Sequence, residues 1–123
     1  MFENSNVGID IVYINRFKDL PYDSNKKFYE KIFNKSEINY CIKFKNPYPH
    51  FAARFAVKEA LVKSIHTKID LKDIEIIQKN SKPMIKSSKK MQYTFNLSLS
   101  HDGDYAIAIV ISKKSNNSTT KHT

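Results

Sequence analysis

"FAARFAVKEALVKSI", residues 51–65, predicts a helix that is apolar around most of its circumference and is therefore buried. Its charged residues are Arg54, Lys58, Glu59 and Lys63. At about 100° per residue, Glu59 and Lys63 share one face of the helix, one turn apart. Arg54 and Lys58 form a second pair on another side. A lone carboxylate among cations in so apolar a helix indicates a ligand site; the alternative is an ordinary ion pair on a solvated face.

A second lone acid, Asp10, lies in "VGIDIVYI", residues 7–14, which is rich in β-branched residues and predicts a strand. A carboxylate in the middle of an apolar strand is costly unless it is paired or binds a metal. Because side chains alternate along a strand, Gly8 lies on the same side as Asp10 and leaves space beside the carboxylate. The alternative is an edge strand that exposes Asp10 to water.

The C-terminal part of the sequence predicts two strands joined by a turn. The strands are "YTFNLSLS", residues 93–100, and "YAIAIVIS", residues 105–112. Between them lies "HDGD", in which Asp102-Gly103 is a good hairpin signal. His101 ends the first strand beside this turn, where it is either a binding residue or an ordinary surface histidine.

Two shorter helices are predicted before the long one. Residues 24–33 predict a helix with Ser24 as its N-cap, and residues 34–44 predict a second helix capped by Ser36. The sequence "NPYP", residues 46–49, predicts a break before the long helix begins.

After the long helix the pattern changes to strands. Residues 71–78 alternate and predict a strand, which "KNSKP" turns back toward "MIK". Helices in the first half and an antiparallel meander in the second half, after an N-terminal strand, indicate an α+β fold. We expect a single domain over residues 1–112. Residues 113–123 are polar and predict a disordered tail.

The composition limits the classes of protein to consider. The chain has 123 residues and a net charge of +9, which is compatible with an acidic partner, although lysine-rich background composition is an alternative. No apolar run reaches the roughly 18 residues of a membrane span. Glu3 and Asp10 argue against a secretory signal at the N-terminus. Cys41 is the single cysteine, which fits a reducing compartment, and we expect a cytoplasmic protein.

Several kinds of chemistry lack their usual signals in this sequence. No cysteine–histidine spacing suits zinc, and with 2 glycines there is no glycine-rich phosphate loop and no serine-hydrolase elbow. What remains is a pair of isolated carboxylates, Asp10 and Glu59, with scattered cations. Magnesium typically takes one or two protein carboxylates together with phosphates and waters, so these residues suggest a magnesium ion that holds a phosphate.

Three motifs in order resemble the holo-acyl-carrier-protein synthases, the small group of 4′-phosphopantetheinyl transferases. They are Gly-x-Asp at residues 8–10, Arg-Phe-Ala-x-Lys-Glu-Ala at residues 54–60 and Ser-x-Ser-His at residues 98–101. Each motif alone is weak evidence for the family, but all three in this order and at this spacing are strong evidence. The resemblance spans nearly the whole chain except the tail.

The resemblance implies an enzyme that moves the phosphopantetheine arm of coenzyme A onto a serine of acyl carrier protein for fatty acid synthesis, releasing 3′,5′-ADP. It implies a homotrimer with active sites between subunits. Asp10 and Glu59 match the magnesium ligands, and Lys63 matches a pyrophosphate contact. These three are the candidate catalytic residues. The proton acceptor for the serine is either Glu59 or a metal-ordered water.

The resemblance also assigns residues to the two substrates. Arg54 and His101 match residues that hold the 3′-phosphate of coenzyme A from the neighbouring subunit, and Pro83 falls where the family lines the adenine pocket. Lys58 is a further candidate contact to the coenzyme. Residues that match basic positions facing the acidic carrier protein are Arg16 and Lys27.

The sequence departs from the family pattern at three places. Residues 66–68, His-Thr-Lys, stand where the family usually has glycines, and Ser81 stands where a glycine is common. Asp102 follows His101, so a carboxylate neighbours the predicted phosphate contact.

Two other functions compete with this interpretation. One is a basic nucleic-acid-binding module, favoured by the charge and by 7 tyrosines and 8 phenylalanines. Most of these aromatic residues follow apolar patterns typical of a core, and no RNA-binding signature is present. The other is a related transferase that acts on a different carrier domain. Magnesium-dependent release of 3′,5′-ADP from coenzyme A would separate a transferase from a binding module.

Overall fold

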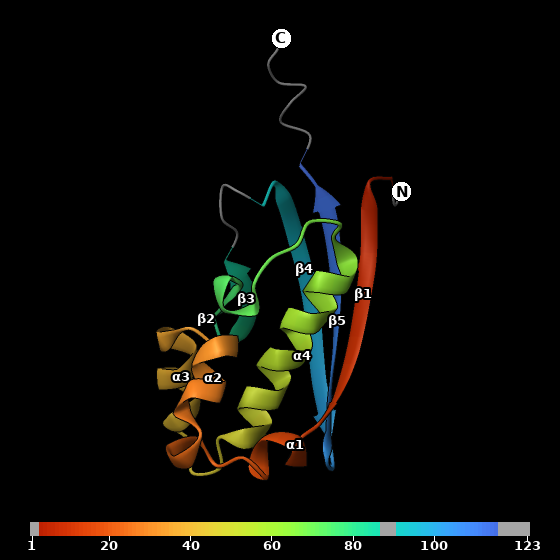
Figure 1. Ribbon diagram of the computed structural model, residues 1–123. Coiled ribbons are helices and arrows are strands. Elements are labelled where there is room, and N and C mark those ends of the chain that lie inside the picture. The colour runs from red at the N-terminus through yellow and green to blue at the C-terminus, as the bar shows by residue number, and fades with distance from the viewer. Residues whose placement is uncertain (1–2, 87–90, 116–123) are drawn as a thin grey trace.

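A computed structural model describes residues 3–86 and 91–115 of the chain. The long helix α4 (Tyr48–Ser64) lies across one face of a three-stranded antiparallel sheet (Figure 1). The N-terminal strand pairs with the last strand rather than with a sequence neighbour, a long-range pairing that was not predicted. The strands of this sheet, in spatial order, are β1 (Ser5–Tyr13), β5 (Tyr105–Lys114) and β4 (Tyr93–Asp102).

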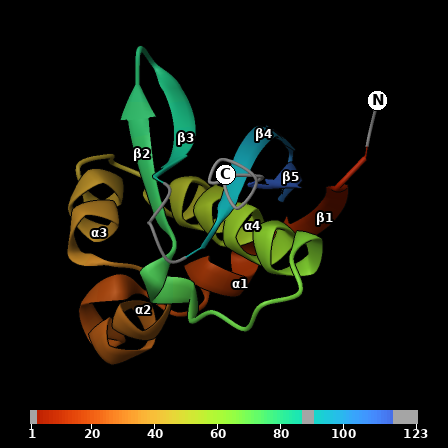
Figure 2. The same cartoon turned by 90° about the horizontal axis from the view of Figure 1, so that it is seen from above.

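Of the remaining elements, the helices lie on the side of α4 away from the sheet, and the strands lie next to β4 (Figure 2). They include a separate antiparallel hairpin, which confirms the predicted turn back within "KNSKP". The predicted α+β fold class is confirmed. The elements are α1 (Asn15–Lys18), the 3₁₀ turns η1 (Tyr22–Ser24) and η2 (Leu71–Asp73), α2 (Lys26–Ile32), α3 (Lys35–Ile42), β2 (Glu75–Lys79) and β3 (Lys82–Lys86).

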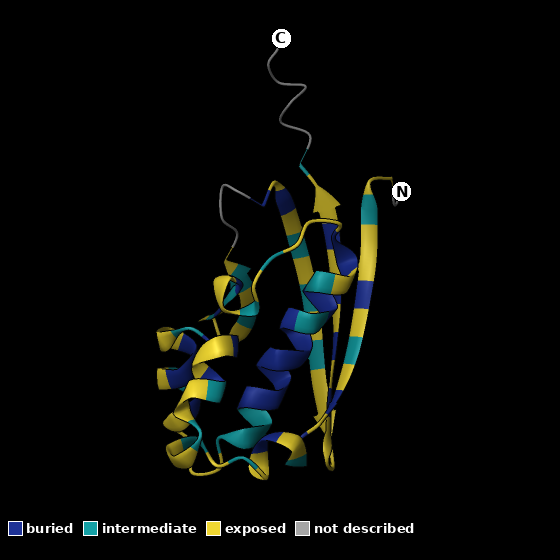
Figure 3. Ribbon diagram, in the orientation of Figure 1, coloured by how far each residue is buried: buried dark blue, intermediate teal, exposed yellow. Residues whose placement is uncertain are grey.

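Helix α4 is apolar nearly all round because it is covered on several sides, by the sheet and by the shorter helices (Figure 3). Between α4 and the N-terminal helices lies a buried aromatic cluster of Phe17, Tyr29, Phe33 and Phe51, with neighbouring ring centroids 4.7–6.2 Å apart. These rings form core and offer no stacking platform on the surface. The aromatic content therefore gives the nucleic-acid-binding alternative little support.

Strand β1 approaches α4 unusually closely at Gly8. A Cβ atom at this position would lie 1.9 Å from the carbonyl oxygen of Ala60 and 3.0 Å from the backbone nitrogen of Ser64. Only glycine fits there without moving the strand or the helix. The sequence suggested that Gly8 leaves space beside Asp10; in the structure this space is filled by the backbone of the helix.

The helix caps differ from those predicted. Helix α3 is capped by Asn34 instead of Ser36: the Asn34 side chain accepts from the backbone N–H of Glu37, and the Glu37 carboxylate accepts from the N–H of Asn34. Helix α2 follows Asn25, while Ser24 belongs to the preceding 3₁₀ turn.

Several boundaries also move. Helix α4 already begins at Tyr48, because Pro49 is tolerated in the first turn of a helix, where its missing N–H is not needed. The strand predicted at 71–78 begins only after η2. Strand β4 runs through His101 and Asp102, so the hairpin turn is Gly103-Asp104, with Gly103 at φ +57°. Strand β5 extends two residues into the predicted tail, whose residues 116–123 lie outside the described residues.

Candidate active site

Asp10 faces α4 from the middle of β1. Its side chain is 16% exposed, and its carboxylate accepts a hydrogen bond of 3.0 Å from Nζ of Lys63. Lys63 also donates to the carbonyl oxygen of Ile9 at 3.0 Å. Strand β1 is indeed an edge strand, as one alternative proposed, but the carboxylate of Asp10 points toward the helix instead of standing open in water.

Glu59 lies half-buried on α4, one turn before Lys63. The Glu59–Lys63 ion pair, which was the alternative to a ligand site, does not form, since Lys63 bonds to Asp10 instead. Asp10, Glu59 and Lys63 therefore come together where β1 crosses α4. Across the described ranges, no third metal-binding side chain joins the two acids. A pair of carboxylates without histidine or cysteine fits magnesium, which completes its octahedron with phosphate oxygens and waters, and does not fit zinc.

Arg54 is a buried cation on a different side of α4. It is 5% exposed, its guanidinium lies 4.1 Å from the ring centroid of Tyr40, and it donates to Oε1 of Gln78 at 3.2 Å. Its Nε is buried without a hydrogen-bond partner. No carboxylate lies within 4.0 Å of Arg54 in the described part of the chain. A buried guanidinium without an acid is suited to bind an anion.

Two histidines and a proline surround Arg54. His50 lies one turn before it on α4, and the pKa of His50 is lowered by burial, by Arg54 and by His101. His101 aligns with buried Ala106 of β5, so its side chain lies on the sheet face that α4 covers. Pro83 pairs with Gln78 in the β2–β3 hairpin, which brings it next to the Arg54 contact. His50 was not predicted; its position four residues before Arg54 is the signal that could have found it.

Lys58 corrects one prediction. Its ammonium group is fully buried and donates to Oε1 of Glu37 at 2.6 Å and to the carbonyl oxygens of Ile32 and Leu71 at 2.9 and 2.8 Å. Burial lowers the pKa of Lys58, and Glu37 opposes this effect. All three N–H bonds have acceptors inside the protein. The prediction that Lys58 contacts the coenzyme is therefore wrong: Lys58 joins α4 to α2, to α3 and to η2.

The Asp10–Glu59–Lys63 group and the Arg54–His101 group do not face each other within one chain. Arg54 and Glu59 are about 140° apart around α4. Their partners lie on opposite edges of the sheet, because β1 carries Asp10 and β4 carries His101. Helix α4 fills the space between the two groups.

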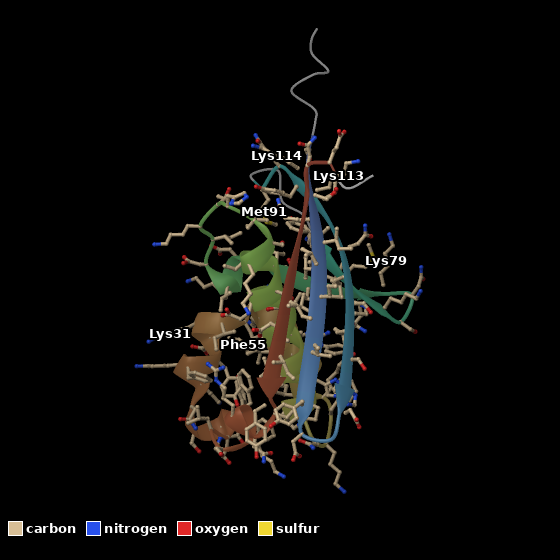
Figure 4. The ribbon with its side chains drawn as sticks, turned by 90° about the vertical axis from the view of Figure 1, so that its right-hand side faces the viewer. Lys31, Phe55, Lys79, Met91, Lys113 and Lys114 are labelled. Carbon is tan, nitrogen blue, oxygen red and sulfur yellow. The ribbon has the colours of Figure 1, made fainter. Side chains whose placement is uncertain are left out.

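Arg16 and Lys27 lie on α1 and α2. Both are exposed. The guanidinium of Arg16 lies 4.8 Å from the ring centroid of Phe55, on the helical side of the sheet (Figure 4). Neither residue forms an ion pair within the described ranges, so both charges are available to a partner.

The fold is that of a known family. The family model of the 4′-phosphopantetheinyl transferase superfamily matches residues 6–110, and the chain belongs to this family. Among curated relatives, it is similar to the holo-[acyl-carrier-protein] synthase of Thermodesulfovibrio yellowstonii, with 39% identity over 108 residues that cover 85% of this chain and 95% of the relative. The resemblance predicted from the three motifs is thus confirmed.

Comparison with solved structures leads to the same family. The holo-(acyl-carrier-protein) synthase of Bacillus anthracis, in complex with CoA (3′,5′-ADP), superposes with a TM-score of 0.76 and 31% identity, covering 89% of this chain and 96% of that one. The Helicobacter pylori holo-[acyl-carrier-protein] synthase in complex with coenzyme A gives a TM-score of 0.75 and 33% identity, covering 87% of this chain and 99% of that one. No helix in the described ranges is long and apolar enough to cross a membrane.

Proposed function

We propose that this protein transfers the 4′-phosphopantetheine arm of coenzyme A to a serine of an apo acyl carrier protein and releases 3′,5′-ADP. The observation that carries the proposal is the meeting of Asp10, Glu59 and Lys63 at the crossing of β1 and α4. Asp10 and Glu59 come from two of the three motifs that define the resemblance, and Lys63 lies one turn after Glu59. Curated relatives and coenzyme A-bound neighbours of the same fold support the same reaction.

Asp10 and Glu59 would hold a magnesium ion. Bound there, magnesium offsets the negative charge that develops on the pyrophosphate as the bond to the phosphopantetheine phosphorus breaks. The side chain of Lys63 is 53% exposed, and its ammonium group would contact the pyrophosphate after breaking its hydrogen bond to Asp10. The serine hydroxyl gives up its proton to Glu59 or to a water beside it. Arg54 and His101 bind the 3′-phosphate, and Pro83 lies along the adenine.

The carrier that we propose as substrate is the acidic acyl carrier protein of fatty acid synthesis, and the cellular location that we propose is the cytoplasm. Cys41 is compatible with the proposed location. It is buried, and burial raises the pKa of its thiol to about 12, so it stays protonated at neutral pH and does not enter disulfide exchange. The location stays a prediction.

We propose a homotrimer with active sites between subunits, and two features support it. A coenzyme A molecule must reach both the Asp10–Glu59–Lys63 group and the Arg54–His101 group, which lie on different sides of α4. A neighbouring copy can supply the second group. The face of the sheet turned away from α4 also carries a continuous row of exposed apolar side chains, which further copies would cover. Its members are Val7, Ile9, Ile11, Tyr13, Tyr105, Ile107, Ile109 and Ile111.

We expect Ile109→Glu to dissociate the trimer and abolish transfer. Ile109 lies opposite Ile9 in the middle of the apolar face, and a carboxylate there would be buried unpaired against the other subunits. Light scattering of the variant should give the mass of a monomer. Lys79→Glu is the control: it introduces a carboxylate on the β2–β3 hairpin, outside the apolar face, and should leave the trimer intact (Figure 4). Wild-type protein that is monomeric at micromolar concentration and fully active would overturn the proposed assembly.

The reaction itself is tested by mass spectrometry of an apo acyl carrier protein after incubation with coenzyme A and magnesium. The carrier should gain the mass of one phosphopantetheine group, and equimolar 3′,5′-ADP should appear. A carrier that keeps its apo mass, under conditions in which a known synthase modifies it, would refute the proposal.

The double variant Arg16→Glu, Lys27→Glu should raise the apparent KM for carrier strongly and leave coenzyme A affinity unchanged. Both side chains are exposed, and docking of an acidic partner depends on charge and on salt. KM is compared with that of wild type at several salt concentrations. Lys18→Glu, Lys31→Glu changes the net charge equally on the same two helices and is the matched control. An unchanged KM for carrier at low salt would show that the carrier docks on another surface of the protein.

A further inference from the structure

The Arg54–His101 group has a third basic member, His50. His50 and Arg54 lie one turn apart on α4, and His101 approaches from the end of β4 closely enough to affect the charge state of His50. No carboxylate lies within 4.0 Å of any of the three in the described ranges. Asp102 follows His101 in sequence, but successive strand residues point to opposite faces of the sheet.

His50 is held in a fixed orientation. Its ring stacks on Phe44 with centroids 3.7 Å apart and planes at 15°, and Tyr40 meets it edge-on at 6.2 Å. Arg54 in turn lies over the same Tyr40, and its Nε is buried with no partner. The imidazole and the guanidinium therefore share one aromatic support. Such an arrangement presents two preorganised donors to one anion.

Within the described ranges, the charged groups that act on His50 are basic: Arg54 from its own helix and His101 from β4. Tyr40 of α3 contacts its ring, and Lys43, the residue that caps α3, lies over Tyr40. Burial, then Arg54, then His101 lower the pKa of His50 from its usual value, so the imidazole is neutral at neutral pH in the free protein. A doubly charged phosphomonoester bound among these groups raises the pKa of His50, because its negative charge favours the protonated ring.

We propose that His50 is the third basic contact of the 3′-phosphate and that it takes up a proton when the phosphate binds. This inference rests on the proposed function, since it concerns the coenzyme of that reaction. Its consequence is a preference for ligands with a 3′-phosphate that depends on pH. The contribution of His50 to phosphate affinity is complete below the pKa that His50 has in the free protein. It is lost as the pH rises through the higher pKa that His50 has in the complex.

The test compares 3′,5′-ADP with 5′-AMP, which lacks the 3′-phosphate, in wild type and in His50→Phe. Phenylalanine keeps the stack on Phe44 but cannot be protonated. Calorimetric titrations in two buffers of different ionisation enthalpy give the number of protons taken up on binding. Wild type should take up more protons with 3′,5′-ADP than the variant does. The preference is the ratio of the affinities for 3′,5′-ADP and 5′-AMP. This ratio should fall from acidic to alkaline pH more steeply in wild type than in the variant. The extra fall should be about tenfold for each unit by which binding raises the pKa of His50.

The variant isolates His50, because all other groups of the protein and of the ligand are the same in both measurements. His50→Gln serves as a second variant, and circular dichroism checks that each is folded. Equal proton uptake and equal pH dependence in wild type and in a folded variant would overturn the inference while leaving the transferase proposal intact. Wild-type protein that binds neither 3′,5′-ADP nor coenzyme A would instead refute the proposed function, and the inference with it.

Discussion

Glu59→Ala and Asp10→Ala should each abolish transfer while the protein remains folded. Each change removes one of two carboxylates available to magnesium, and a lost metal ligand costs several kcal/mol of transition-state stabilisation, or roughly a hundredfold or more in rate. The fold should tolerate both changes. Glu59 has no ion-pair partner in the described ranges, and Asp10→Ala frees only Lys63, whose side chain is 53% exposed.

Rates are measured as holo-carrier formed, by mass spectrometry, with thermal unfolding as the check on folding. Glu59→Gln keeps the shape of the side chain and should be nearly as inactive as the alanine variant, since an amide is a poor magnesium ligand. Glu30→Ala, which removes an exposed acid from α2, is the control and should retain activity. A Glu59→Ala protein that transfers at near wild-type rate would refute the assignment of Glu59 to the metal.

The largest effect on stability is expected at the buried pair of Lys58 and Glu37. Lys58→Met leaves the Glu37 carboxylate buried without a cation, although the backbone N–H groups of Asn34 and Ile76 still donate to it. Removing one partner of a buried pair typically costs about 3–5 kcal/mol of unfolding free energy. Lys58→Met with Glu37→Gln removes the uncompensated charge and should recover part of this loss. Urea unfolding of wild type, both single variants and the double variant measures the coupling.

The same experiment discriminates between the two roles considered for Lys58. A structural pair predicts lower unfolding free energy and, in protein that remains folded, little change in affinity for coenzyme A. If Lys58→Met were as stable as wild type but bound coenzyme A much more weakly, Lys58 would be a coenzyme contact, as the sequence motif suggested.

Local patterns were sufficient to predict the long helix, the strand around Asp10 and the hairpin near His101, because each depends on periodicity and turn residues close in sequence. The grouping of Asp10 with Glu59 and Lys63 also followed from the motifs. The pairing of β1 with β5 could not be predicted this way, because it joins opposite ends of the chain. Nothing local in the sequence distinguishes one strand partner from another.

The same reason explains the error at Lys58 and the omission of His50. The carboxylate that neutralises Lys58 comes from Glu37, 21 residues earlier, and a one-dimensional motif does not reveal that partner. His50 lies in a segment that the sequence assigned to the margin of a proline-rich break. Only the start of α4 at Tyr48 places it on the same helix face as Arg54.

The contact between Gly8 and Ala60 has a consequence for recognising active members of this family from sequence. Asp10 follows Gly8 by two residues and Glu59 precedes Ala60 by one, so the main-chain contact sets the separation of the two acids. The residue that sets this separation contributes no side-chain atom to the proposed metal site. A chain with both acids but with a larger residue two positions before the first could not bring its carboxylates to the same spacing. The glycine is therefore as diagnostic of a competent site as the ligands themselves.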